Sequence, residues 1–193
     1  MITKIEEYIT DTNDKKYQFI KNWLYTHLSR EELIVYIRID ENYKVNSIED
    51  LCFFSKFDEC KSIDVECNYV YKDFSVSFSK LTSLYNGPIF VNNHYLCTYC
   101  KLKNLEGIAN FIGDDLAFSI NPLTSLNGLN YESTYILGGD TIEWLQKPEQ
   151  QHLIKDLLNE NILWYDQFKN CLNDESKREF DWFINTKILS KEE

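Results

Sequence analysis

Two cysteines, Cys97 and Cys100, are the residues of this chain best placed by type and spacing to do chemistry. Two thiolates at CxxC spacing can supply half of a zinc site or form a redox-active pair. A zinc site needs further ligands, for which Cys60, Cys67 and His94 are candidates, but no second CxxC motif and no HxxxH motif follows. The spacing alone therefore leaves metal binding, redox chemistry and a purely structural role open.

No other group of residues forms a known catalytic constellation. The three histidines, His27, His94 and His152, are too far apart in the sequence pattern to suggest a triad, and GxSxG, HExxH, GxGxxG and Walker-type motifs do not occur. Gly138-Gly139-Asp140 indicates a turn and is too weak a motif for phosphate binding. Cys171 lies near the end of an expected amphipathic helix with no histidine nearby in sequence. We therefore expect no catalytic residue, no metal and no cofactor, and a protein that is not an enzyme.

The elements that must position these residues follow a repeat of 21 residues. Leu81, Leu102 and Leu123 each open the same Leu-x-x-Leu phrase, and apolar residues stand seven and five positions before each of them. Self-similarity at a fixed period of roughly 20–50 residues is typical of a solenoid, whose coils must stack to bury their apolar sides. We predict an inward-facing strand at positions minus seven to minus five, and extended or 3₁₀-like return segments that bury Val91 and Ile112. The inward residues are Phe74, Tyr95 and Leu116, then Val76, Cys97 and Phe118, then Ser79, Cys100 and Asn121.

Several motifs keep this frame: Leu81-Thr-Ser-Leu84, Gly87-Pro88, Val91, Cys97 and Asn121-Pro122-Leu123. With them the stretch 51–145 resembles the short leucine-rich-like repeats of many bacterial and phage proteins, whose units read LTSLxGxPxxVxGxFxCxxNxL. The departures are the displaced Gly87, Cys100 in place of asparagine and the divergent segment 129–145. The resemblance implies a solenoid interaction scaffold with no reaction attached. The repeat frame itself accounts for Cys97 and Cys100 as core residues without metal.

We predict an α+β fold, with a short leucine-rich-repeat-like solenoid of about four to five coils between helical N-terminal and C-terminal caps. The parallel sheet is expected on the concave face. The expected organisation is an N-terminal helical and strand cap over residues 1–50, the solenoid over 51–146 and a C-terminal helical cap over 147–193.

The flanks are expected to be less regular. An amphipathic helix is predicted over 14–28 and a strand over 33–39. In the flanking coils Phe53 stands seven positions before Cys60, as Leu137 does before Trp144. Helical spacing recurs over 149–160, 161–172 and 174–189, and Pro148 fits a first helical turn.

The chain is acidic, with 31 Asp plus Glu against 20 Lys plus Arg and a net charge of −11. No basic stripe exists, so direct binding to nucleic-acid phosphates is not expected. The start of the chain lacks the apolar stretch of a signal peptide, and no apolar run is long enough for a membrane span, so we expect a cytoplasmic protein without membrane contact. One acid-rich stretch is expected to be a solvated face that keeps the protein soluble, and the alternative is that it steers a basic partner: Asp40, Glu41, Glu49, Asp50, Asp58, Glu59, Asp64 and Glu66.

Four large residues stand three positions before each repeat leucine or its equivalent: Phe57, Phe78, Tyr99 and Ile120. Strict strand alternation would send this position inward, whereas in a leucine-rich coil the chain has begun to turn there and the side chain points to the concave side. We predict an outward aromatic-apolar stripe that contacts a partner, because aromatic residues dominate binding hot spots. The alternative is that the terminal helices cover the stripe. The other predicted contact residues are Ser77, Thr98 and Ser119 beside it and His94 at a strand start, with Lys80 and Lys101 on the flank.

These patterns favour a non-catalytic module that binds another protein as an inhibitor or adaptor; by analogy, a phage anti-defence or immunity-type inhibitor is expected. One alternative is an acidic nucleic-acid mimic, whose binding to a DNA- or RNA-binding protein would weaken steeply with salt. The other is a small-ligand binder or enzyme with a pocket between the solenoid and the C-terminal helices, which its ligand would stabilise against heat. The oligomeric state is not predicted.

Overall fold

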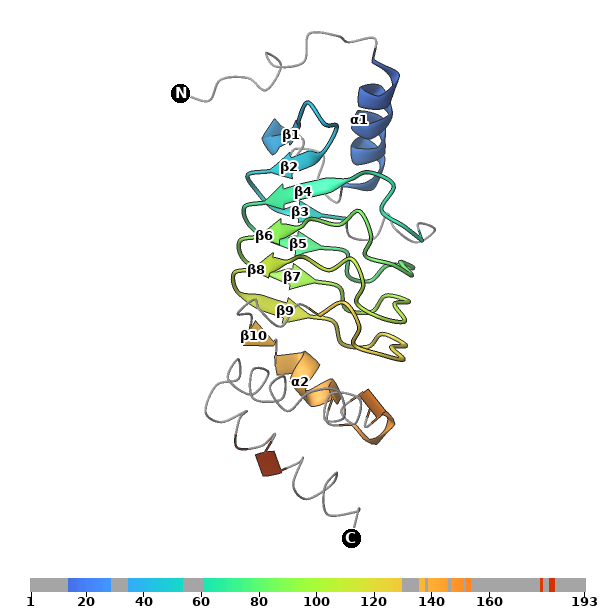
Figure 1. The fold of residues 1–193 in the computed structure, drawn as a ribbon, viewed down its shortest axis with the longest axis vertical. Helices are drawn as coiled ribbons and strands as arrows, with labels where there is room; N and C mark the ends of the chain where they lie inside the picture. The colour runs from blue at the N-terminus through green and yellow to red at the C-terminus, as the bar shows by residue number, and fades with distance from the viewer. Residues whose placement is uncertain are drawn as a thin grey trace.

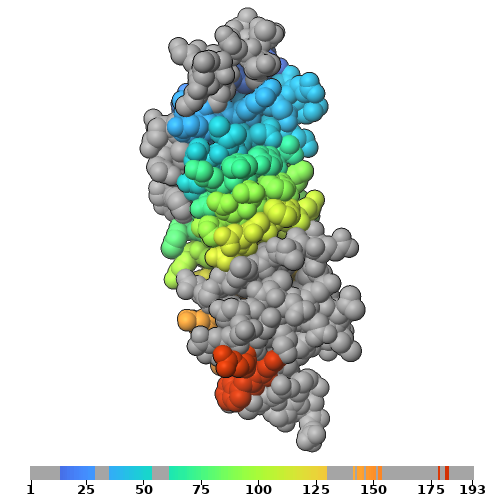
Figure 2. Space-filling model, turned by 90° about the vertical axis from the view of Figure 1, so that its left-hand side faces the viewer, coloured from blue at the N-terminus to red at the C-terminus, as the bar shows by residue number. Residues whose placement is uncertain are grey.

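A computed structural model of the chain shows a parallel β-solenoid of about three turns (Figure 1). The structure describes residues 14–28, 35–53, 61–129, 136–137, 139–145, 147–150, 152–153, 178 and 181–182. Two sheets run along the solenoid, sheet A with the order β1-β2-β4-β6-β8 and sheet B with the order β10-β9-β7-β5-β3. The turns stack in chain order, which Figure 2 shows as parallel bands from blue to yellow. The predicted α+β class and solenoid architecture are confirmed.

Sheet B contains the strands that the repeat frame predicts. β3 spans Leu51–Cys52, β5 Phe74–Ser75, β7 Tyr95–Leu96, β9 Asp115–Ala117 and β10 Ile136–Leu137. Neighbouring strands are parallel, and the register places Phe74 beside Tyr95 and Tyr95 beside Leu116. These three side chains are fully buried, so the predicted inward face is confirmed. The same holds for the residues two positions later: Val76, Cys97 and Phe118.

The return segments form parallel strands of the second sheet, sheet A. β2 spans Val45–Ser47, β4 Cys67–Val70, β6 Phe90–Val91 and β8 Phe111–Ile112. Val91 pairs with Val70 and with Ile112, and all three side chains are buried, because β-branched residues suit the inward face of a strand. Burial of Val91 and Ile112 in extended return segments is as predicted, whereas the pairing of these segments into a sheet was not predicted. The core of the solenoid therefore lies between sheets A and B.

The first coil differs from its predicted register. β3 pairs with β5 so that Leu51 lies beside Phe74, and the Phe53 amide donates to the Ser75 carbonyl at 2.9 Å. Leu51 therefore takes the position that was predicted for Phe53. The reason is length, because Leu51 and Phe74 are 23 residues apart rather than 21. Cys60, which was predicted to open this coil, lies outside the described residues.

The last coil ends in a helix. Leu137 pairs with Leu116 as predicted, but α2 (Gly139–Leu145) then begins, so Trp144 belongs to a helix rather than to a coil. Trp144 packs edge-on against Phe118, with ring centroids 6.2 Å apart, and Thr141 Oγ1 accepts a hydrogen bond from the Phe118 amide at 3.2 Å. Pro148 begins the 3₁₀ helix η3 (Pro148–Gln150). The helices predicted over 149–160, 161–172 and 174–189 lie almost entirely outside the described residues.

The N-terminal helix α1 (Lys15–His27) packs one apolar face on the solenoid (Figure 1). The Asp14 carboxylate caps it by accepting hydrogen bonds from the amides of Lys16 and Tyr17 at 2.8 and 3.2 Å. The predicted apolar stripe is buried at Ile20, Trp23, Leu24 and Leu28, and Trp23 meets Phe53 edge-on at 5.3 Å. None of the helices within the described ranges has the length and apolar character that a membrane crossing requires.

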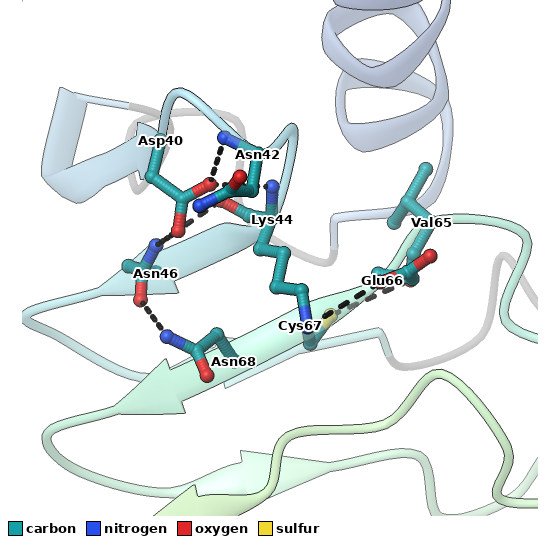
Figure 3. A network of polar contacts seen from close by, with 8 residues as sticks. All are labelled: Asp40, Asn42, Lys44, Asn46, Val65, Glu66, Cys67 and Asn68. Carbon is teal, nitrogen blue, oxygen red and sulfur yellow. Dashed lines mark hydrogen bonds and ion pairs between the residues drawn. The ribbon is translucent and has the colours of Figure 1, made fainter.

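Strand β1 (Ile37–Ile39) closes the N-terminal edge of sheet A by pairing antiparallel with β2. The strand predicted over 33–39 is thus found in its last three residues, and residues 33–34 lie outside the described ranges. Figure 3 shows the polar network of this hairpin. The Asp40 carboxylate accepts from the amides of Asn42 and Lys44, both at 2.9 Å, and from the side chain of Asn46 at 3.2 Å. The Asn68 side chain donates to Asn46 at 3.1 Å, which ties the hairpin to β4.

Candidate functional site

A left-handed turn follows each of the strands β5, β7 and β9 in sheet B. It places Phe78, Tyr99 and Ile120, three positions before the repeat leucines, at φ of 60°, 55° and 57°. The turn interrupts the alternation of the strand, so these side chains point outward although the residues on either side of each lie deeper in the protein. Their exposed fractions are 61, 49 and 42%. The outward direction predicted for this position is confirmed, and the left-handed turn is its physical cause.

These three residues form a continuous ladder, here called the corner ladder. Phe78 and Tyr99 stack with ring centroids 4.9 Å apart and an interplanar angle of 13°. The backbone holds the spacing, because the Phe78 amide donates to the Thr98 carbonyl at 2.9 Å and the Tyr99 amide donates to the Ser119 carbonyl at 3.1 Å. Phe57, the fourth predicted member, lies outside the described residues. The described ladder thus presents two stacked rings and one isoleucine to solvent.

The backbone of the corner ladder is costly for its residue types. A left-handed conformation costs an L-residue ~1–2 kcal/mol, and for a β-branched residue such as Ile120 it is a clear outlier. At other left-handed positions of the described residues, Asn86, Gly107 and Gly128, at φ of 66°, 90° and 102°, are the types that tolerate this conformation best, whereas Tyr43, at φ of 62°, packs partly buried against the core. Large apolar residues at the corner are therefore stabilised neither by a relaxed backbone conformation nor by full burial of their side chains. Strain of this kind in exposed residues points to a function.

The hydroxyl-bearing residues that were predicted beside the ladder do not all lie at the surface. Ser77 and Ser119 are buried, at 4 and 2% exposure, which corrects their assignment as surface contact residues. They lie inside because the left-handed turn begins only at the next residue. Thr98 is partly exposed, and its hydroxyl donates to Ser77 Oγ at 3.2 Å. Ser77 therefore connects neighbouring coils, and only Thr98 of the three is open to a partner.

The flank of the corner ladder is basic. Lys80 and Lys101 follow the ladder residues Phe78 and Tyr99 by two positions, and both are exposed. No acidic residue occurs between Asp73 and Glu106, although the chain as a whole carries a charge of −11.

The acid-rich stretch, in contrast, is largely engaged within the fold. Glu49 pairs with Lys72 at 2.5 Å and Glu66 with Lys44 at 3.6 Å, while Asp40 holds the β1–β2 hairpin. Asp58 and Glu59 lie outside the described residues. Within the described residues of this stretch, these three carboxylates are therefore engaged in the fold rather than free to form a phosphate-like row.

His94 lies at the start of β7, as predicted, and its side chain is 34% exposed. Its Nδ1 accepts a hydrogen bond from the Asp115 amide at 3.4 Å. Equivalent contacts repeat along the solenoid, because the His94 amide donates to the Asp73 carboxylate at 3.3 Å and the Asp73 amide to the Asp50 carboxylate at 3.4 Å. Each coil therefore supplies one side-chain acceptor to the next, which gives His94 a structural role.

His94, Asp114 and Asp115 are also a group of possible metal ligands, with ligand atoms within 4.8 Å of one another. The Asp114 carboxylate faces His94 Nε2 at 3.8 Å, whereas the Asp115 carboxylate faces Nδ1 at 3.6 Å. The two carboxylates thus face different ring nitrogens, and Nδ1 already accepts the Asp115 amide. The hydrogen bond at Nδ1 and the matching contacts of Asp73 and Asp50 already account for the position of His94, so the group does not need a metal ion to explain it.

The CxxC pair lies in the core. Cys97 and Cys100 are buried, and Cys100 Sγ lies 3.3 Å from Ser79 Oγ and 3.2 Å from the Val76 carbonyl oxygen. Burial raises the pKa of both thiols, and it raises the pKa of Cys67 to about 12. The thiolate that metal binding or redox exchange requires is therefore strongly disfavoured. Cys60 and Cys171 lie outside the described residues.

The other two histidines contact other residues of the described fold. His27 stacks on Trp23 at the end of α1, and His152 Nε2 contacts the Leu123 carbonyl oxygen at 3.2 Å.

A second aromatic ladder was not predicted. Tyr69, Phe90 and Phe111 lie on successive strands of sheet A and stack with centroids 4.9 and 4.5 Å apart and interplanar angles of 13° and 9°. Their spacing of 21 residues was a sequence signal that could have shown it. None of the three has a positive φ, and Tyr69 and Phe90 are partly buried. This ladder therefore stabilises sheet A at ordinary backbone cost, which makes it the weaker candidate for a binding surface.

Comparison with known protein families, with curated proteins and with solved structures finds no match to this chain. The functional conclusion therefore depends on the geometry and charge of the described surface.

Proposed function

We propose that this protein is a non-catalytic protein-interaction module, an inhibitor or adaptor of another cytoplasmic protein, and that the corner ladder is its contact surface. A phage anti-defence or immunity-type inhibitor fits this proposal by analogy. We also infer that the solenoid is leucine-rich-repeat-like with four to five coils, since the Leu-x-x-Leu phrase recurs and strands are added at both ends by β3 and β10.

One observation carries the functional proposal. Phe78, Tyr99 and Ile120 hold large apolar side chains in solvent on left-handed backbone, where asparagine or glycine would be less strained. Exposed aromatic side chains bury large areas at interfaces with little loss of conformational entropy, and they dominate the affinity of many interfaces. A partner that covers the ladder would convert this exposed apolar area into binding free energy.

The test is affinity capture from a lysate of the cells that produce the protein. Wild type is compared with Phe78→Asn/Tyr99→Asn, because asparagine tolerates left-handed backbone and should preserve the turn. The matched control is Ile89→Asn, which removes a side chain of 51% exposure outside the ladder. Circular dichroism of all three proteins shows whether the fold is intact.

The expected result is one protein that is retained by wild type and by Ile89→Asn and lost with the double variant. Equal capture by all three folded proteins would contradict the proposed contact surface. Repeating the capture at moderate salt separates the mimic alternative, because binding through an array of carboxylates should weaken steeply, whereas an apolar contact persists.

A further inference from the structure

We propose that the segment of the partner that seats on the corner ladder is an acidic peptide with apolar side chains. This inference rests on the proposed function of the ladder and adds the chemistry of what binds there. It follows from the charge that surrounds the exposed rings, which is opposite in sign to that of the whole chain.

Lysines lie in two successive exposed rows on one side of the apolar row. Lys80 and Lys101 follow the ladder by two positions, and the Lys101 amide donates to the Leu81 carbonyl at 2.8 Å, which aligns the two lysine-bearing coils. The next exposed row contains Lys61, Thr82, Lys103 and Thr124. Its order is set by backbone bonds from Thr82 to Lys61 at 3.0 Å and from Thr124 to Lys103 at 2.8 Å.

These ammonium groups are not neutralised by carboxylates of the described fold. Among the described residues, none of Lys61, Lys80, Lys101 and Lys103 has an ion pair, whereas Lys44 and Lys72 on the sheet A side both do. Residues 74–105 contain three of these lysines and no aspartate or glutamate, and residues 116–131 contain no acid either. The acids of the neighbouring coils lie instead at the starts of the sheet B strands, such as Asp73 and Asp115, and in return turns, such as Glu106.

This arrangement suits a peptide that carries both apolar and acidic side chains. An apolar centre provides affinity when it is covered, and charges on its rim select the partner and accelerate encounter. Carboxylates on a peptide lying across the ladder would meet Lys80 and Lys101 on one side of the rings. A basic peptide would leave these lysines facing like charges.

Single-stranded nucleic acid fits the same corner less well. Bases bind by stacking on exposed ring faces, but Phe78 and Tyr99 stack on each other at 4.9 Å, so their facing surfaces are already covered. The net charge of −11 opposes a long polyanion, whereas a short peptide with a few carboxylates responds mainly to the nearby lysines.

The experiment is a selection from a random peptide library displayed on phage, with immobilised full-length protein as bait. Three baits are compared: wild type, Phe78→Asn/Tyr99→Asn, and the charge reversal Lys80→Glu/Lys101→Glu. Enriched peptides are then synthesised with a fluorescent label, and their affinity for each bait is measured by anisotropy. A labelled oligo-dT serves as the nucleic-acid probe.

The expected result is enrichment by wild type of peptides that combine aspartate or glutamate with aromatic or aliphatic residues. Their affinity should fall at least about tenfold with either double variant, and it should decrease with salt for wild type. The charge-reversed bait should select basic peptides in their place.

The remaining outcomes overturn one proposal or both. Uncharged or basic peptides that bind wild type and require Phe78 and Tyr99 would overturn the acidic partner and leave the ladder as a protein-binding surface. Selected peptides that bind the ladder variant as well as wild type, or no enrichment at all, would overturn both proposals. Oligo-dT that binds wild type and is lost with both double variants would replace the peptide by nucleic acid.

Discussion

Replacing Ile120 by glycine and, separately, by alanine tests whether the corner ladder is held in a strained conformation. Both substitutions remove the side chain beyond Cβ, so the loss of partial burial differs between the two variants only by the one methyl group that alanine keeps. They differ in how well glycine and alanine tolerate the backbone conformation at this position, which is left-handed at φ of 57°. We expect the Ile120→Gly protein to be more stable than the Ile120→Ala protein.

The magnitude follows from two opposing terms. Left-handed backbone costs alanine ~1–2 kcal/mol that glycine avoids, whereas glycine loses ~0.5–1 kcal/mol more conformational entropy on folding. Near the middle of both ranges, glycine should therefore exceed alanine by about 0.5–1 kcal/mol in the free energy of unfolding. For a chain of 193 residues this corresponds to a difference of ~1–4 °C in Tm.

The assay is thermal unfolding of both variants by circular dichroism in the same buffer. Lys101 provides the control position, because it is exposed and is not among the residues with positive φ. There the order should reverse, with Lys101→Ala more stable than Lys101→Gly by ~0.5–1 kcal/mol. If alanine exceeds glycine at position 120 by as much as it does at position 101, the corner is not strained, and strain does not support the ladder as a contact surface.

Four further predictions concern other parts of the solenoid. Gly107→Ala should lower the free energy of unfolding by about 2 kcal/mol or more in urea denaturation, because a Cβ there would lie 2.5 Å from backbone at φ of +90°; a loss well under 1 kcal/mol would contradict this. Tyr95→Phe should raise the free energy of unfolding by about 1 kcal/mol in the same assay, since the buried hydroxyl has no hydrogen-bond partner among the described residues, and a net loss would indicate one. Cys97 and Cys100 should resist iodoacetamide in the native protein and react after unfolding, as read by mass spectrometry, because burial raises the pKa of both thiols. A hydrogen bond from Tyr43 lowers the pKa of Asp14 below 3.8, so the stability that the Asp14 carboxylate contributes is present above pH 3.8 and is lost as pH falls through the lowered pKa. The difference in Tm between wild type and Asp14→Asn should therefore narrow at low pH, and a difference that stays constant with pH would contradict this prediction.

The solenoid could be predicted from the sequence because its period appears directly in residue types. Each coil must bury the same side, so Phe74, Tyr95 and Leu116 recur at the spacing that their strand pairing later shows. The outward direction of the corner-ladder side chains could be predicted only from the resemblance to leucine-rich coils. Strand alternation alone would have sent Tyr99 inward, and no residue type there indicates a left-handed turn.

Other features could not be predicted because they depend on pairing between segments rather than on local pattern. The return segments are short, and two residues such as Phe90 and Val91 carry too little alternation to show that they form a sheet. The first coil was misaligned because its added length lies between Leu51 and Phe74, where no leucine phrase marks the register. Burial of Ser77 and Ser119 follows from where the left-handed turn begins, which a period of 21 does not specify.

Because the corner ladder repeats once per coil, its length can change only by whole coils. Each coil adds one rung, and neighbouring strands in a sheet lie ~4.8 Å apart, so duplication of one 21-residue unit would lengthen the apolar row by that distance and leave the existing rungs in place. Loss of one unit would shorten it by the same step. A protein built this way can match partners of different lengths through gain or loss of coils, without redesign of the contact itself.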